Sequence, residues 1–214
     1  MRTYKSYSFA LIGKVCSGKS SIFTSLTQQV PKTTYTSTSF NTYDVVRFED
    51  DEDIVNIEVL DTPGISLSEA LTTIFNSTVS CLLYIVDLTK KEVYEEIEIV
   101  LKELNRLSAN KSTSSCGSTG SSLSVRFGLP FVFVATRKDL VKPQVANAFI
   151  ERVREKGFDA FVCDANDIEA VNTLFDDLVY EPYVSPQFSQ KVEKVFKVDK
   201  KKGKKKCALP CVFF

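Results

Sequence analysis

Gly13-Lys14-Val15-Cys16-Ser17-Gly18-Lys19-Ser20 follows directly after the apolar run 7–12, which reads Tyr-Ser-Phe-Ala-Leu-Ile. The spacing matches the pattern G-x-x-x-x-G-K-S, and the run before it predicts a strand that leads into a phosphate-binding loop. The glycines let the backbone wrap closely around a diphosphate, Lys19 can neutralise the outer phosphates, and the Ser20 hydroxyl can coordinate magnesium. Residues 21–26 predict a helix whose first N–H groups would point at the phosphates.

The composition predicts one packed domain in a reducing compartment. The chain has 214 residues, 43% of them hydrophobic, which suits one ordinary domain and not two. It contains no histidine, which excludes Ser-His triads and zinc sites that need imidazole. Its six cysteines include no C-x-x-C pair, as expected of a cytosolic protein. Residues 1–5 do not predict a signal peptide, and no apolar run reaches the roughly 18 residues of a membrane span.

Apolar runs and helical patterns alternate along the chain and predict an α/β fold. A hairpin is expected from two runs on either side of an acidic turn, and later strands alternate with helices. The predicted strands are 7–12, 43–48, 54–60, 80–86, 131–135 and 160–163, and the later helices are 90–107, 143–156 and 167–180. Six strands and about five helices predict a mostly parallel sheet covered by helices. Residues 108–126, rich in Ser, Thr, Asn and Gly, predict a surface insertion, with a flexible linker favoured over a phosphorylation loop.

Three further motifs follow predicted strands at their carboxyl ends, where open α/β sheets bind ligands. They are Asp61-Thr62-Pro63-Gly64, Thr136-Arg137-Lys138-Asp139 and Asp164-Ala165-Asn166. A carboxylate at the first position of D-x-x-G can hold magnesium through water, and the N–H of its glycine can sense a terminal phosphate.

This ordered set of four motifs resembles the small guanine-nucleotide-binding proteins of the Ras superfamily over residues 7–180. The resemblance implies a P-loop small GTPase fold in a domain 1–182, with Mg²⁺ and GTP or GDP as ligands. Thr38 and Tyr35 match the spacing of that family's second magnesium-binding threonine and the tyrosine before it, with Thr34 and Thr36 as near competitors.

The resemblance also implies how the base is read. Asp139 would bind guanine through two hydrogen bonds, and the Ala165 N–H would contact the guanine oxygen. The predicted nucleotide-binding residues are Gly13, Lys14, Val15, Cys16, Ser17, Gly18, Lys19, Ser20, Ser21, Tyr35, Thr38, Asp61, Gly64, Thr136, Arg137, Asp139, Asp164, Ala165 and Asn166. Within this set, Lys19, Thr38 and Gly64 are the candidate catalytic residues, and Ser20, Thr38 and Asp61 are the candidate metal ligands.

Two departures from the Ras pattern predict slow hydrolysis. Ile65 stands where Ras-like proteins usually have a glutamine that orients water, and Val15 stands where they usually have a small residue. D-T-P-G followed by an apolar residue also resembles Era-type, translation-factor-class GTPases, which place the water differently. Arg137 replaces the lysine that lies over the base, and arginine can also stack on a ring. A docking module with negligible hydrolysis is the alternative, whereas Asp139 disfavours an ATPase or nucleotide kinase.

The C-terminal segment 183–214 predicts a membrane-targeting tail. Residues 191–206 hold nine lysines and two acidic residues, and the chain ends in a C-a-a-X-like box at Cys211. Cys211 would be prenylated, with the terminal Phe favouring geranylgeranyl, and Cys207 is a candidate palmitoylation site. Two alternatives are less favoured. The last residues could be an apolar end without lipid, and the lysines could form a nuclear-localisation or RNA-binding segment.

Together these features predict a GDP/GTP switch in signalling or trafficking at the cytoplasmic face of a membrane, the plasma membrane by preference. The expected partners are an anionic lipid surface, effectors, an exchange factor and an activating protein, with no nucleic acid. Segments 32–40 and 64–77 would sense the terminal phosphate.

Overall fold

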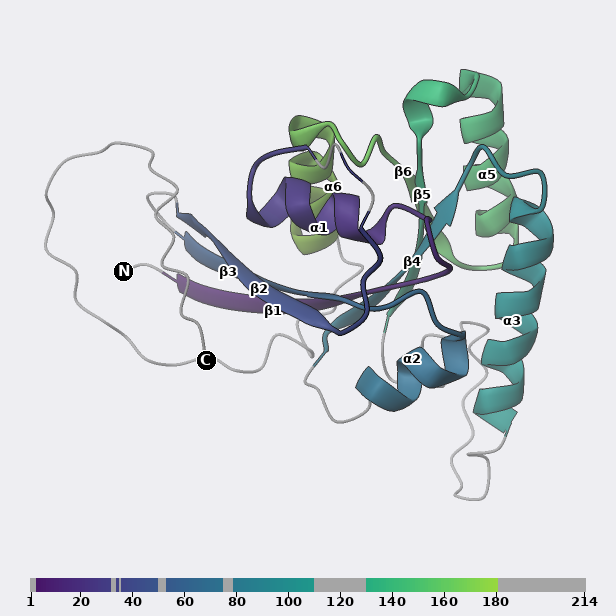
Figure 1. Cartoon of the computed structure of the whole chain (residues 1–214), viewed down its shortest axis with the longest axis horizontal. Coiled ribbons are helices and arrows are strands. Elements are labelled where there is room, and N and C mark those ends of the chain that lie inside the picture. The colour runs from purple at the N-terminus through teal and green to yellow at the C-terminus, as the bar shows by residue number, and fades with distance from the viewer. Residues whose placement is uncertain are drawn as a thin grey trace, which may run out of the picture.

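The computed structural model confirms an α/β fold with a six-stranded, mostly parallel sheet (Figure 1). It describes residues 3–31, 34, 36–49, 53–74, 79–109 and 130–180. The strands are β1 (Thr3–Ile12), β2 (Thr42–Glu49), β3 (Asp53–Asp61), β4 (Cys81–Asp87), β5 (Phe131–Thr136) and β6 (Asp159–Val162). Five α-helices lie within these ranges: α1 (Lys19–Thr27), α2 (Leu67–Ile74), α3 (Val93–Ala109), α5 (Pro143–Glu155) and α6 (Ile168–Tyr180). A 3-10 turn, η1, spans Lys138–Leu140.

The strand order is β2-β3-β1-β4-β5-β6, and β2 alone runs antiparallel to its neighbour. The predicted hairpin is therefore the β2–β3 pair, in which Thr42 lies opposite Asp61. All other pairs are parallel, so the carboxyl ends of β1, β3, β4, β5 and β6 point the same way. That common end of the sheet is where the loops of all four motifs meet.

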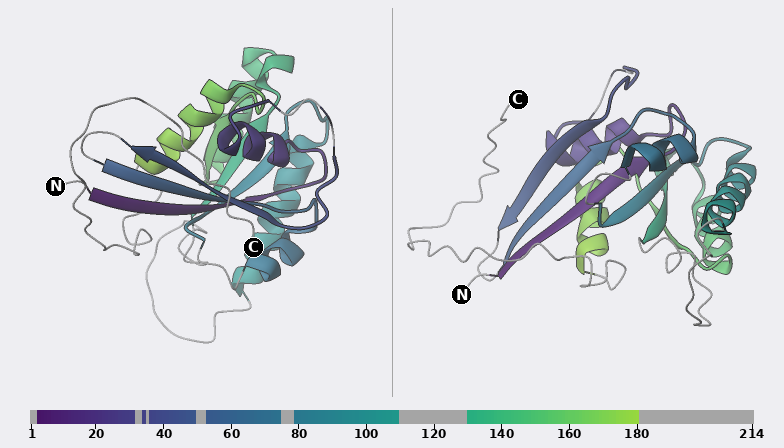
Figure 2. Two further views of the ribbon diagram at one scale, coloured as in Figure 1. Left: turned by 60° about the vertical axis from the view of Figure 1, so that its left-hand side comes forward. Right: turned by 90° about the horizontal axis from the view of Figure 1, so that it is seen from below.

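Helices cover both faces of the sheet, and alternate strand residues enter two separate cores. Phe9 and Leu11 pack on the side of α1 and α6, whereas Ala10 and Ile12 pack on the side of α2, α3 and α5. The views in Figure 2 show the same division. Because β4 and β5 are buried on both faces, all their residues are apolar apart from the two at their ends, Asp87 and Thr136.

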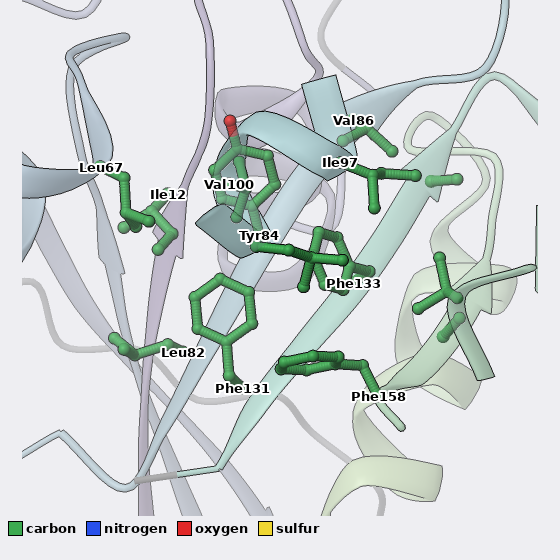
Figure 3. Packing of buried hydrophobic residues seen from close by; sticks show 14 of the residues in the cluster. Ile12, Leu67, Leu82, Tyr84, Val86, Ile97, Val100, Phe131, Phe133 and Phe158 are labelled. Carbon is green, nitrogen blue, oxygen red and sulfur yellow. The ribbon is translucent and has the colours of Figure 1, made fainter. Parts of the chain in front are cut away.

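An aromatic cluster fills the core beneath α3 and α5 (Figure 3). Phe131 and Phe133 lie 5.3 Å apart between ring centroids, and Tyr84 lies 5.7 Å from Phe133. Phe158 packs edge-on at 5.7 Å from Phe133. These separations are those of favourable aromatic pairs, so the cluster anchors β4 and β5, whose ends carry part of the site.

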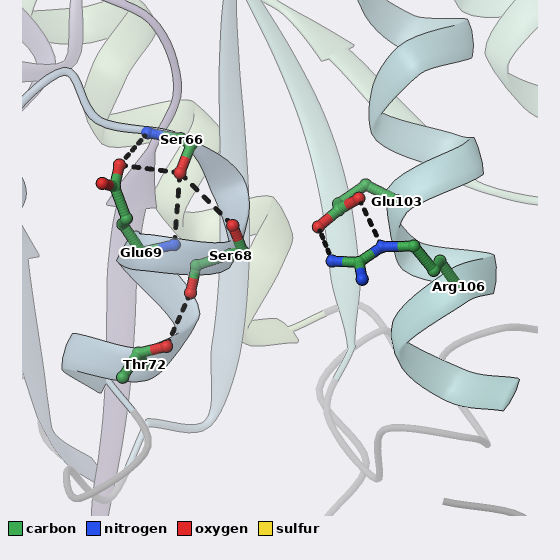
Figure 4. Close-up of polar contacts among 6 residues, drawn as sticks. All are labelled: Ser66, Ser68, Glu69, Thr72, Glu103 and Arg106. Atoms are coloured by element: carbon green, nitrogen blue, oxygen red, sulfur yellow. Dashed lines mark hydrogen bonds and ion pairs between the residues drawn. The ribbon is translucent and has the colours of Figure 1, made fainter. Parts of the chain in front are cut away.

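Helix α2 was not predicted from the sequence, although a local signal was present. Ser66 and Glu69 form a capping box: the Ser66 N–H donates to Glu69 Oε2 at 3.0 Å, and the Glu69 N–H donates to Ser66 Oγ at 3.3 Å (Figure 4). The Ser66 hydroxyl and N–H together lower the pKa of the Glu69 carboxyl. The pattern S-x-x-E at 66–69 therefore predicts this helix start, and the helix lies within the segment 64–77.

Two other boundaries differ from the predictions by more than two residues. Strand β1 begins at Thr3 because its pairing with β3 begins there, with Thr3 opposite Asp53. Helix α3 begins at Val93 because Lys90 belongs to a turn, in which its N–H donates to the Asp87 carbonyl at 3.2 Å. On the exposed face of α3, Arg106 forms a two-pronged ion pair with Glu103 (Figure 4).

Several predictions fall outside the described residues. These are Tyr35, residues 110–126 of the insertion, and the tail with Cys207 and Cys211. The domain boundary at 182 and the tail 183–214 therefore stay predictions. Helices in the described part of the chain include none with both the length and the apolar character of a transmembrane span.

Candidate functional site

A pocket of about 480 Å³ lies at the carboxyl end of the parallel strands. Small-molecule sites typically have volumes of about 300–1,000 Å³. Five segments that are far apart in sequence line it. The lining residues are Val15, Cys16, Ser17, Gly18, Lys19, Ser20, Ser21, Thr34, Thr36, Ser37, Thr38, Thr62, Gly64, Thr136, Arg137, Asp139, Leu140, Asp164, Ala165 and Asn166. The structure thus brings together parts of all four predicted motifs.

The phosphate loop has a backbone that only its glycines allow. Gly13 has φ +141°, and a Cβ there would collide with the Ile85 carbonyl oxygen. Gly18 has φ +98°, and a Cβ there would lie 2.9 Å from the Thr136 side chain. Gly18 also caps α1 without a side-chain hydrogen bond, so the first N–H groups of α1 stay available to a ligand.

The Lys19 ammonium lies inside the loop. It donates to the carbonyl of Gly13 at 2.9 Å and to that of Lys14 at 2.7 Å, and the residue is 6% exposed. Burial lowers the pKa of Lys19, and the nearby Asp61 carboxylate opposes this shift. An anion in the pocket would favour the charged ammonium in the same way as Asp61.

Three oxygen-bearing side chains converge beside the loop. Ser20 Oγ lies 2.7 Å from Thr38 Oγ1, and Thr38 Oγ1 lies 3.5 Å from Asp61 Oδ2. These are the three predicted metal ligands, and their hard oxygen atoms suit Mg²⁺, which binds few protein ligands and keeps water and phosphate oxygens. Thr34 and Thr36 also line the pocket, but the hydroxyl in contact with Ser20 is that of Thr38.

The D-T-P-G loop is held against the phosphate loop. The buried Thr62 hydroxyl donates to the Leu11 carbonyl at 2.8 Å. A Cβ on Gly64 would lie 2.5 Å from the Val15 nitrogen, so no larger residue fits there without movement. The Val15 side chain is 57% exposed at the pocket wall, whereas Ile65 packs against the core next to α2 and α3 and is absent from the pocket lining.

Thr136 joins the phosphate loop to the sheet. Its hydroxyl is buried and lies 2.7 Å from the Ser17 carbonyl, to which it donates, and 3.2 Å from the Val86 carbonyl. After it, Arg137 takes a left-handed backbone conformation with φ +61°, and Asp139 follows in η1 at the pocket wall.

The D-A-N loop closes the same end of the pocket as Asp139. Asp164 Oδ1 accepts the Asn166 N–H at 2.9 Å, which shapes the turn. The buried Ser25 hydroxyl of α1 donates to the Ala165 carbonyl at 2.7 Å. Helix α1 therefore supports both the phosphate loop and this second loop.

Two carboxylates near the site were missed by sequence reasoning. Asp87 lies 3.2 Å from Arg137, between Oδ2 and Nη1. Glu96 of α3 accepts the Tyr84 hydroxyl at 3.0 Å and pairs with Lys14 at 3.2 Å. This pairing directs the Lys14 side chain toward α3, and Lys14 is not among the lining residues. No spacing in the sequence signals either contact.

The geometry agrees with a comparison of the sequence with known families. A family model described as 50S ribosome-binding GTPase matches residues 8–115, about half of the chain. The matched region contains the phosphate loop and the D-T-P-G loop and ends before Thr136. No curated protein matches the chain. Membership of the Ras superfamily in particular stays a prediction. Because the match covers half of the sequence and includes the phosphate loop, the chain belongs to the GTPase family that this model describes.

Proposed function

We propose that this GTPase is a membrane-attached GDP/GTP switch with slow intrinsic hydrolysis. The observation that carries the proposal is the convergence of the phosphate loop, Thr38, the D-T-P-G loop and the Thr136–Asp139 loop on one pocket. Such a pocket can distinguish the diphosphate form of a nucleotide from the triphosphate form, because the segments near Thr38 and Gly64 can contact the terminal phosphate.

In this proposal, the phosphate end of the pocket is built from Lys19, Ser20, Thr38 and Gly64, with the buried Asp61 carboxylate next to Thr38. Lys19 neutralises the outer phosphates, and the Gly64 N–H donates a hydrogen bond to the terminal phosphate. Ser20 and Thr38 would hold magnesium and Asp61 would support it, and the 2.7 Å and 3.5 Å contacts among these side chains fit that role. When bound, the ion neutralises charge that develops on the transferred phosphoryl group.

The other end of the pocket reads the base. In this proposal, Asp139 accepts two hydrogen bonds from guanine, and Ala165 offers its backbone N–H to the guanine oxygen. The exposed Asp139 and the Asp164–Asn166 loop line the same pocket, which supports this assignment. The same residues disfavour adenine, which has an acceptor at N1 and no amino group at C2, so Asp139 would meet no matching pair of donors.

The proposal of slow hydrolysis is supported by two apolar residues, Val15 at the pocket wall and Ile65 directly after the D-T-P-G loop. Ile65 is partly buried against the core and offers no group to orient water, and Val15 lines the wall where an arginine from a partner would enter. The same two residues favour a second candidate function, a nucleotide-binding docking module that scarcely hydrolyses GTP. Comparable switches turn over at only about 10⁻⁴ per second without help.

Membrane attachment rests on the sequence of the tail. The lysines of 191–206 would attract anionic lipid, and a prenyl group on Cys211, with Cys207 as a second site, would add the anchor. Effectors, an exchange factor and an activating protein are the expected partners, at the segments near Thr38 and Ile65.

Single-turnover hydrolysis of bound radiolabelled GTP by the full chain with magnesium tests the proposal. Slow, guanine-specific turnover supports the switch, and ATP and Asp139→Asn serve as controls. Tight GTP binding without turnover over many hours favours the docking module. Failure of the full chain to bind guanine nucleotide refutes both candidates.

A further inference from the structure

The buried carboxylate of Asp87 lies at the end of β4, opposite the start of the base-reading loop. Asp87 and Thr136 are register partners in the parallel β4–β5 pair. The residue after Thr136 therefore begins next to Asp87, and the Arg137 Nη1 atom lies 3.2 Å from Asp87 Oδ2. The contact is set by the strand register and not by sequence proximity.

The two oxygens of Asp87 have different partners. Oδ1 accepts the Thr89 N–H at 2.9 Å and the Thr89 hydroxyl at 2.6 Å, which shapes the turn after β4. Oδ2 faces Arg137. The turn and the ion pair can therefore be separated by a substitution that keeps one oxygen and removes the charge.

The two partners of this ion pair differ in burial, so one of them fixes the position of the other. Asp87 is 5% exposed, whereas the Arg137 side chain is 42% exposed and lines the pocket. A buried carboxylate is costly unless a cation neutralises it, so Asp87 holds the guanidinium in place. The other part of Arg137 stays open to the pocket, two residues before Asp139 in the chain. A guanidinium is planar and can stack on an aromatic ring while it keeps an ion pair at its edge.

We infer that Asp87 is a positioning residue for the nucleotide base, because it holds the Arg137 guanidinium in the pocket wall as a preformed surface for the purine ring. This inference rests on the proposed guanine site at Asp139. Holding a long side chain in its binding conformation reduces the ordering cost of binding. Asp87 therefore increases affinity without touching the nucleotide, and it acts on the base and not on the phosphates.

The test is a thermodynamic cycle on the full chain, with fluorescent GDP as the probe and inorganic pyrophosphate as a competitor. Asp87→Asn keeps an oxygen for Thr89 and removes the anion that faces Arg137. We expect about fivefold weaker GDP binding by Asp87→Asn. Arg137→Ala is expected to weaken GDP binding at least as much, and adding Asp87→Asn to it is expected to change nothing further. Pyrophosphate affinity is expected to stay at the wild-type value in Asp87→Asn.

Glu98→Gln is the matched control, because it removes the carboxylate of another ion pair, 2.8 Å from Lys156 and away from the pocket lining. It is expected to bind GDP as the wild type does. Three results overturn the inference: wild-type GDP affinity in Asp87→Asn, the same loss in the Arg137→Ala background, or an equal loss of pyrophosphate affinity, which would indicate a disturbed fold. Failure of the wild type to bind GDP would instead refute the proposed function, so the two failures are distinguishable.

Discussion

Replacing Thr136 by valine isolates the bond between the phosphate loop and the sheet. Valine has nearly the same shape, so the substitution removes the hydroxyl and leaves little cavity. The lost contacts are those from Thr136 Oγ1 to the carbonyls of Ser17 at 2.7 Å and Val86 at 3.2 Å. A typical intramolecular hydrogen bond contributes about 1 kcal/mol, and unpaired buried acceptors add a desolvation cost.

We therefore expect Thr136→Val to lower the free energy of unfolding by about 2 kcal/mol, roughly a 30-fold change in the folding equilibrium. Because the chain contains no tryptophan, urea unfolding of the full chain is followed by circular dichroism. With a urea slope of about 2 kcal/mol per molar, the midpoint falls by about 1 M. Nucleotide affinity is expected to fall as well, since the Ser17 carbonyl loses its anchor.

Thr173→Val provides the matched control. Its hydroxyl donates to the Glu169 carbonyl at 2.8 Å on the exposed face of α6, where that carbonyl lies within the helix. Surface changes of this kind usually stay within about 0.5 kcal/mol. The reasoning is refuted if Thr136→Val is as stable as the wild type, or if Thr173→Val loses as much stability.

Three further predictions follow from the structure. Glu69→Ala removes the carboxylate of the Ser66 capping box. Because the pKa of Glu69 is lowered in the folded state, we expect the wild type to be more stable than Glu69→Ala by the full amount above pH 4.5, and this difference to disappear as the pH falls through the lowered pKa. Thermal unfolding of both proteins at several pH values measures the difference. Ile65→Gln places an amide against the core, so it is expected to cost about 1–2 kcal/mol in urea unfolding without accelerating GTP turnover; faster turnover would contradict this placement. Cys211→Ser is expected to move the full chain from the membrane fraction to the supernatant in cells that prenylate proteins, and an unchanged distribution would exclude Cys211 as the anchor.

Local patterns in the sequence were sufficient for most of the fold. Strands β4 and β5 are continuous apolar runs because both faces are covered by helices, and the phosphate loop is recognisable because its glycines sit where the backbone turns. The helix α2 escaped prediction because it is only eight residues long, although the capping box of Ser66 and Glu69 marked its start.

The sequence by itself determined the motifs, their order and the sheet they follow, because each depends on residues that are close along the chain. Only the tertiary structure decided which side chains from distant parts of the chain meet. The hydroxyl of Thr136 reaches Ser17, which lies 119 positions earlier, and Asp87 faces Arg137. These contacts depend on strand register and on the packing of α1 and α3 against the sheet, and neither has a local signature in the sequence.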